Sequence, residues 1–180
     1  MRNLRPCRPQ ACVARSHRRS FRALALRRVW THFIAVSPPK AVAVYCEEFD
    51  VPPGAIDRNG HVNNVAFVQW MQDVATRHFA SGGGLALTEA AGAAWVARSH
   101  RIDYLAPAFA GERLRVRTWI VDFGRARSLR RYEFRRAHDD TLLVRAETDW
   151  VFVRADSGRP CAIPEALKAA FVTVGEEAKA

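Results

Sequence analysis

The segment Ile56-Asp57-Arg58-Asn59-Gly60-His61-Val62-Asn63-Asn64 carries side chains that can do acid–base chemistry. An acid, an amide and an imidazole occupy alternate positions, at Asp57, Asn59 and His61, immediately before a predicted helix. The first backbone N–H groups of a helix have no partner within it and attract negative charge. We therefore expect the N–H groups of residues 62–64 to polarise a bound carbonyl, with Asp57 as nucleophile or general base and His61 as its proton partner.

The same residue types also have a structural interpretation. Asp, Asn and Gly are common in turns and helix caps, so Asp57-Arg58-Asn59-Gly60 alone would favour an ordinary turn. The spacing to His61 favours chemistry, because an imidazole beside an acid and an amide at a helix start is suited to proton transfer.

The helix that follows is predicted from its periodicity. From Asn63 to Ala80 apolar residues recur at three- and four-residue spacing and form one stripe: Phe67, Trp70, Met71, Val74, Ala75 and Phe79. Asn63 or Asn64 can cap the helix, and Ser81-Gly82-Gly83-Gly84 should end it. His78 on this stripe, and His100, are interpreted as packing residues.

The rest of the body alternates polar and apolar residues, which predicts half-buried strands. The expected strands are 41–50, 95–105, 113–117, 128–138 and 142–154, and a last helix is expected at 164–171. Links as short as 122–125 and 138–141 require antiparallel neighbours. The predicted class is therefore α+β, with the long helix covering one face of the sheet.

Charge divides the chain of 180 residues, whose formal net charge is +10, into two parts. Residues 1–40 hold ten of the 28 Lys and Arg and no acid, so residues 41–180 hold 18 bases against all 18 acids. We interpret 1–40 as an extension, 41–175 as the folded domain and 176–180 as a tail. The extension is a mis-assigned start, an organelle-targeting peptide or a basic arm that contacts nucleic acid or lipid.

The cysteines are Cys7, Cys12, Cys46 and Cys161, which form no zinc-binding pattern and predict reduced thiols. A metal site is not expected. Without a secretory signal or an apolar run of about 18 residues, we expect a soluble cytoplasmic protein, or one in an organelle matrix if 1–40 is a transit peptide.

The element order and several motifs resemble the hot-dog-fold acyl thioesterases, in both the bacterial 4-hydroxybenzoyl-CoA thioesterase-like branch and the plant acyl-acyl-carrier-protein branch. The resemblance runs from about Val42 to Phe171 and rests on His61-Val62-Asn63-Asn64, on Asp103-Tyr104-Leu105-Ala106-Pro107 and on the Gly158-Arg159-Pro160 turn. It implies a long central helix wrapped by a curved antiparallel sheet, dimers or tetramers with sites at the subunit interface, and no metal or organic cofactor.

The resemblance also implies catalytic roles. Asp57 takes the place of the catalytic carboxylate of the bacterial branch, and Asn59 and His61 match both branches. Asp103 stands where the plant branch has a supporting Glu, which is one methylene longer. The N–H of Asn64 matches the family's oxyanion donor.

Other residues are expected to contact the substrate. Val62, Asn63 and Phe67 belong to the helix start and to the helix face that can line an acyl tunnel. A basic stretch comprises Arg125, Arg127, Arg130, Arg131, Arg135 and Arg136, and its alternation predicts a mostly solvated strand face. We expect Arg125 or Arg127 to bind the phosphates of CoA or of a carrier-protein pantetheine, because guanidinium groups fork onto phosphate.

Together these features predict an acyl thioesterase that hydrolyses an acyl-CoA or acyl-acyl-carrier-protein thioester as a homodimer or homotetramer, with no nucleic-acid or membrane partner. One alternative is an enoyl-thioester hydratase or dehydratase of the same fold, whose motif resembles Asp-x-Asn-Pro-x-His. The other is a non-catalytic acyl-CoA sensor whose basic arm binds DNA.

Overall fold

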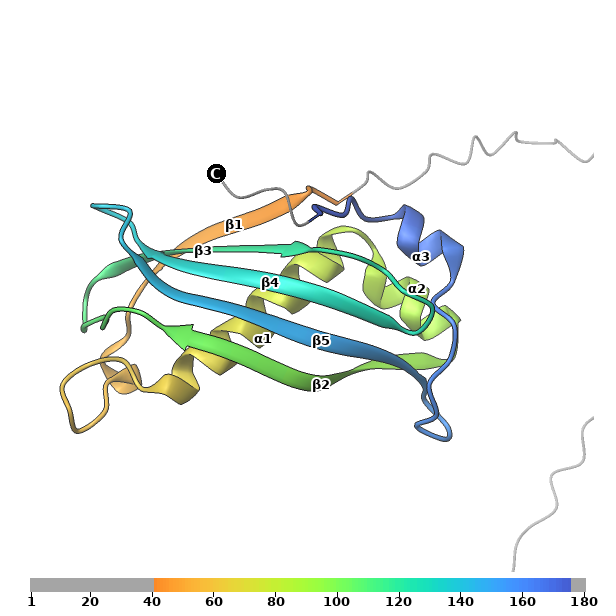
Figure 1. The fold of residues 1–180 in the computed structure, drawn as a ribbon, viewed down its shortest axis with the longest axis horizontal. Helices are drawn as coiled ribbons and strands as arrows, with labels where there is room; N and C mark the ends of the chain where they lie inside the picture. Colours follow the sequence, from red (N-terminus) through yellow and green to blue (C-terminus); the bar gives the residue numbers. More distant parts are fainter. Residues whose placement is uncertain (1–40, 176–180) are drawn as a thin grey trace, which may run out of the picture. The chain divides into compact units, whose positions relative to one another are not determined.

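A computed structural model describes residues 41–175; the predicted extension at 1–40 and the tail at 176–180 lie outside the described residues. Five antiparallel strands form one sheet in the order β1-β3-β4-β5-β2 (Figure 1). The strands are β1 (Val44–Asp50), β2 (Ala93–Tyr104), β3 (Arg113–Ile120), β4 (Arg127–Arg136) and β5 (Leu142–Arg154). The helices are α1 (Asn64–Ser81), α2 (Gly84–Ala90) and α3 (Glu165–Ala169), with a 3-10 turn at Pro53–Ala55. The α+β class and the hot-dog architecture are confirmed.

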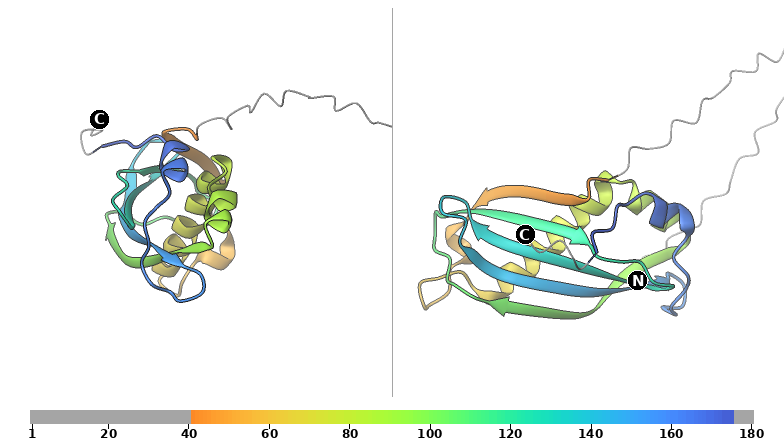
Figure 2. Two further views of the ribbon diagram at one scale, coloured as in Figure 1. Left: turned by 90° about the vertical axis from the view of Figure 1, so that its right-hand side faces the viewer. Right: turned by 45° about the horizontal axis from the view of Figure 1, so that its top comes forward.

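Helix α1 is the central element, and the sheet curves around it (Figure 2). It begins where predicted, because the side-chain oxygen of Asn63 accepts a hydrogen bond of 2.9 Å from the N–H of Val65. Its buried face comprises Phe67, Met71, Val74, Ala75 and His78. Burying this stripe against the sheet is the main source of the helix's stability. No helix among the described residues is long and apolar enough to cross a membrane.

The glycine run after α1 forms a corner between two helices. The helix ends at Ser81 as expected, but α2 begins at Gly84, which the sequence analysis did not predict. Gly83 has φ +72°, a conformation that L side chains rarely adopt. A Cβ on Gly82 would lie 2.8 Å from Phe171, and one on Gly84 would lie 2.6 Å from Phe79. The glycines therefore allow both the turn and the close packing behind it.

Strand β4 alternates as predicted between the face toward α1 and the outer face. Ser128, Arg130, Tyr132 and Phe134 are buried, and the residues between them are more exposed. The basic stretch was expected to be mostly a solvated face, and Arg130 is the exception, because it is only 4% exposed. Its place in the alternation puts it under α1, where hydrogen bonds to its guanidinium compensate part of the cost of burial.

The outer face carries the remaining charges as cross-strand ion pairs. Arg115 on β3 pairs with Glu48 on β1 at 2.8 Å, and Arg131 on β4 pairs with Glu147 on β5 at 3.6 Å. Such pairs are exposed or half-buried and contribute little individually, about 0–1 kcal/mol each. They do keep this face soluble and leave packing to the inner face.

Strand β2 stands at one edge of the sheet, next to β5 only. Most of its residues are exposed, and Val96 has 47% of its surface exposed. A long edge strand is a template for pairing with another strand.

Candidate active site

The loop before α1 is closed into a tight hairpin-like turn. Ile56 and Val62 form an antiparallel bridge, and the N–H of Asp57 donates to the carbonyl oxygen of His61 over 2.9 Å. Within the loop, the N–H of Gly60 donates to the carbonyl of Asp57 over 3.0 Å, and Gly60 has φ +83°. This backbone fixes Asp57 and His61 at the mouth of the loop, directly in front of the helix.

The carboxylate of Asp57 is held by its neighbour Asn59. One oxygen, Oδ1, accepts the backbone N–H of Asn59 at 2.7 Å, and the other, Oδ2, accepts its side-chain Nδ2 at 3.2 Å. The Asp57 side chain is 22% exposed, so its remaining lone pairs can reach a ligand. Asp57 and Asn59, which lie two residues apart in the sequence, are therefore bonded to each other in the structure.

His61 stands close to the same carboxylate. Its Nδ1 lies 3.9 Å from Oδ1 of Asp57, which is beyond hydrogen-bond distance but close enough for an ion pair when the imidazole is protonated. With 39% of its side chain exposed, it can exchange protons with solvent.

The N–H groups at the helix start differ in availability. That of Val62 donates to the carbonyl of Ala108 at 2.8 Å, and that of Asn63 donates to the carbonyl of Ala55 at 2.8 Å. The N–H of Asn64 donates to no residue within 41–175. The predicted group of three oxyanion donors is thereby reduced to one free N–H, at Asn64, and Val62 and Asn63 form the frame that presents it.

Tyr104 at the end of β2 supports the helix start. Its hydroxyl donates to the carbonyl of Asn64 over 3.1 Å, and its ring packs edge-on against Phe67, with centroids 5.9 Å apart. Burial raises the pKa of the Tyr104 hydroxyl. The sequence analysis assigned Tyr104 no role, although the alternation of β2 places it with Ile102 on the inner face. Phe67 itself is buried in the core, 3% exposed, with Phe134 also against it.

The fold of a single chain does not bring Asp103 close to the Asp57 loop. Ile102 and Tyr104 on either side of it pack on the inner face, so Asp103 points to the outer face, where it is exposed. Its register partner is Arg145, and no hydrogen bond joins Asp103 to Asp57 in the described part of the chain.

Arg125 and Arg127 lie toward the other end of the sheet. Arg127 is aligned through β5 with Val96, which is eight residues, or about 26 Å, along β2 from Tyr104. The guanidinium of Arg127 forms an ion pair with Asp149 on the outer face.

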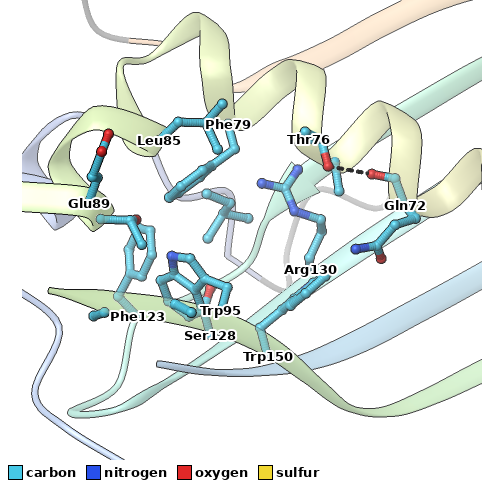
Figure 3. Close-up of a pocket in the computed structure, with 15 residues that line it drawn as sticks. Gln72, Thr76, Phe79, Leu85, Glu89, Trp95, Phe123, Ser128, Arg130 and Trp150 are labelled. Atoms are coloured by element: carbon cyan, nitrogen blue, oxygen red, sulfur yellow. Dashed lines mark hydrogen bonds between the residues drawn. The ribbon is translucent and has the colours of Figure 1, made fainter. Parts of the chain in front are cut away.

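A cavity of about 390 Å³ lies beside the C-terminal half of α1, between that helix, α2 and the sheet (Figure 3). Its lining includes Thr76 and Phe79 of α1, Trp95 of β2, Arg130 of β4 and Trp150 of β5. The Asp57 loop does not line it. The sequence analysis did not predict this cavity. No cluster of three or more His, Cys, Asp or Glu able to hold a metal occurs among the residues described.

Comparison with known proteins identifies the family and supports the fold. The family model of the thioesterase-like superfamily matches residues 51–171. The 1,4-dihydroxy-2-naphthoyl-CoA thioesterase from Synechocystis has a similar structure, with 26% identity, a TM-score of 0.64 and coverage of 71% of this chain and 94% of that one. A hypothetical protein from Staphylococcus aureus in complex with CoA is 20% identical, with a TM-score of 0.64 and coverage of 71% and 80%.

A plant enzyme also shares the fold. The 12:0-ACP thioesterase from Umbellularia californica is 19% identical, with a TM-score of 0.66 and coverage of 74% of this chain and 52% of that one, so this chain spans about half its length. No curated protein matches the sequence.

The family match takes in the Asp57 loop, helix α1 and strands β2 to β5, which is more than half of the chain. The chain therefore belongs to the thioesterase-like superfamily and is a thioester hydrolase.

Proposed function

We propose that this protein hydrolyses an acyl-CoA thioester to the free acid and CoA, with chemistry at the start of α1. The observation that carries the proposal is the free N–H of Asn64, which stands at the N-terminus of an 18-residue helix beside the loop that holds the Asp57 carboxylate. A thioester carbonyl on this N–H would be polarised by the hydrogen bond and by the helix dipole.

As a general base, Asp57 takes a proton from a water molecule while the water oxygen attacks the carbonyl carbon. The C=O electron pair moves onto oxygen, where the N–H of Asn64 stabilises it. When the pair returns, the C–S bond breaks and the thiolate leaves; the proton that Asp57 took from water then passes through His61 to the thiolate, which restores the Asp57 carboxylate. As a nucleophile, Asp57 would itself displace the thiolate, and water would then hydrolyse the mixed anhydride.

Asn59 has a positioning role in either route. Its N–H and Nδ2 occupy one lone pair on each carboxylate oxygen of Asp57. They fix the plane of the carboxylate and leave its other lone pairs free to face the substrate.

We further propose that two copies assemble through the free edge of β2. Antiparallel pairing of β2 with its copy would place the Tyr104 end of one strand beside the Trp95 end of the other. Because Tyr104 contacts Asn64, and Trp95 lines the cavity, the reactive loop of one subunit would then stand next to the cavity of its partner. The cavity is therefore the proposed site of the acyl group.

CoA is the proposed carrier because the similar Staphylococcus aureus structure contains it. Arg125 is the proposed phosphate contact, since it is exposed on the loop that also brings Phe123 to the cavity, whereas Arg127 is already paired with Asp149.

The direct test is thiol release from short, long and aryl acyl-CoAs and from the same acyl groups on acyl carrier protein. The proposal expects release from CoA esters. Release from carrier-protein esters alone would reverse the choice of carrier, and release from neither would refute the assigned reaction.

A further inference from the structure

The cavity beside α1 holds a cation that no carboxylate among residues 41–175 neutralises. Arg130 is 4% exposed and lies on the inner face of β4, between the sheet and α1 (Figure 3). Among the hydrogen bonds of the described part of the chain, only its Nη1 is engaged, with the hydroxyl of Thr118 at 3.1 Å and Nδ1 of His78 at 2.9 Å. Burial lowers its pKa, and within residues 41–175 no carboxylate bonds to it. An unpaired buried charge is costly unless something else compensates it.

His78 does not supply a compensating charge. The carbonyl of Val42 accepts from Nε2 at 2.9 Å, so the imidazole carries its proton there and offers a bare Nδ1 to Arg130. Burial and the neighbouring Arg130 lower the pKa of His78 to about 4. The pair is thus a neutral ring and a full positive charge.

Three further donors in the cavity lining also lack partners. They are buried and have no hydrogen-bond partner in the described part of the chain: the hydroxyl of Thr88 on α2 and the indole Nε1 groups of Trp95 on β2 and Trp150 on β5. Buried polar groups are normally satisfied, so unsatisfied groups that share a cavity call for an explanation. All three line the same cavity as Arg130.

The one acid in the lining does not fill this role. Glu89 on α2 is exposed, and Figure 3 shows its side chain at the opposite end of the cavity from the guanidinium. Most other lining groups are apolar, among them Ala75, Phe79, Leu85 and Ile120. The cavity is thus an apolar chamber with a cationic, donor-rich wall.

From this wall we infer that the acyl group held in the cavity bears a carboxylate at the end remote from the thioester, and that Arg130 binds it. The inference rests on the proposed function, which places the acyl group here. A carboxylate accepts from Nε and Nη2 of the guanidinium, which have no partner in the range 41–175, and supplies the missing negative charge. Trp95 and Thr88 are placed to donate to polar groups of the same ligand.

The test compares matched substrates on the full chain: adipoyl-CoA against hexanoyl-CoA, and suberoyl-CoA against octanoyl-CoA. We expect kcat/KM to favour the carboxylated member of a pair by at least about tenfold, as a charged hydrogen bond implies. Arg130→Met should abolish that preference, and Trp95→Phe should reduce it. Arg131→Met, on the same strand but facing outward, is the matched control and should retain it.

A binding measurement separates this inference from the proposed reaction. Trp95 and Trp150 line the cavity, so adipate should change the intrinsic fluorescence at concentrations where hexanoate does not. The wild-type protein gives this result whether or not Arg130→Met folds. Equal response to adipate and hexanoate, or equal hydrolysis of both esters, overturns the inference and leaves the thioesterase proposal standing. Selective adipate binding without hydrolysis of any ester supports the cavity assignment and refutes the proposed reaction.

Discussion

The Nη1 of Arg130 donates to Nδ1 of His78 across 2.9 Å, joining the inner face of β4 to helix α1. Both side chains are almost fully buried, at 4% and 0% exposure. Thr118 on β3 accepts from the same Nη1, so the contact ties two strands and the helix together. Its geometry depends on His78 remaining neutral, because a protonated Nδ1 could no longer accept.

The protonation of His78 should therefore make stability depend on pH. Its pKa is lowered from 6.5 to about 4 in the folded protein, so between these values the unfolded chain binds more protons. The free energy of unfolding falls as the pH drops below about 6.5 and stops falling on this account below about 4. A shift of this size corresponds to about 3 kcal/mol.

Urea denaturation of wild type and His78→Gln at pH 7 and pH 4.5 measures this contribution. Each protein gives a change in the free energy of unfolding between pH 7 and pH 4.5, which is its pH slope. Carboxylates titrate in both proteins, so the difference between the two slopes gives the contribution of His78. Identical slopes in wild type and variant would show that His78 titrates normally.

Replacing Asp57 by Asn should remove most of the activity. The variant keeps the shape of the side chain and one acceptor oxygen for the N–H of Asn59, but it can neither accept a proton nor attack a carbonyl. We expect kcat to fall by about 10²- to 10⁴-fold with little change in stability. Asp73→Asn on α1, whose side chain bonds Gln69, is the matched control. A folded Asp57→Asn with near-normal thiol release would remove Asp57 from the mechanism.

Gly60 should be needed for the shape of the reactive loop. A Cβ there would touch nothing within 4 Å, so Gly60→Ala tests only the backbone strain at φ +83°. We expect the free energy of unfolding to fall by about 1 kcal/mol. We expect kcat to fall by a larger factor than this loss of stability accounts for, because Asp57 and His61 shift. Gly54→Ala is the control, since it too has open space around it and no positive φ. Equal kcat in both variants would mean that the turn does not position the chemistry.

The sequence analysis predicted the elements that short stretches of sequence determine. The period of the apolar residues and the Asn63 cap located α1, and alternation located the strands. The spacing of Asp57, Asn59 and His61 marked the reactive loop. These patterns are short-range and follow from the geometry of helices and strands.

What the sequence analysis missed depends on contacts between distant segments. Asn64 is the free N–H only because Val62 and Asn63 bond to Ala108 and Ala55, which no local pattern reveals. Arg130 was grouped with a basic stretch that was expected to be mostly a solvated strand face, and it was not singled out as the inward-facing member. Its alternation with Tyr132 and Phe134 was a usable signal that it faces inward.

The same alternation applies to Asp103. Ile102 and Tyr104 face α1, so the residue between them points away from the reactive loop of its own chain. The role that the resemblance implies for Asp103 therefore stays a prediction without support from contacts within one subunit.

The free edge of β2 provides the last prediction. If two copies pair along this strand, Val96, with 47% of its surface exposed, becomes part of the interface. A charge there would be removed from water on assembly, at a cost that opposes pairing. We expect Val96→Glu to shift the protein from dimer or tetramer to monomer in sedimentation velocity, and to lower kcat/KM sharply, since the reactive loop of one subunit serves the cavity of the other. Val172→Glu, which adds the same charge at an exposed residue outside the sheet, should leave both unchanged. A monomeric Val96→Glu with full activity would show that each chain carries a complete site, and an unchanged oligomer would move the interface away from β2.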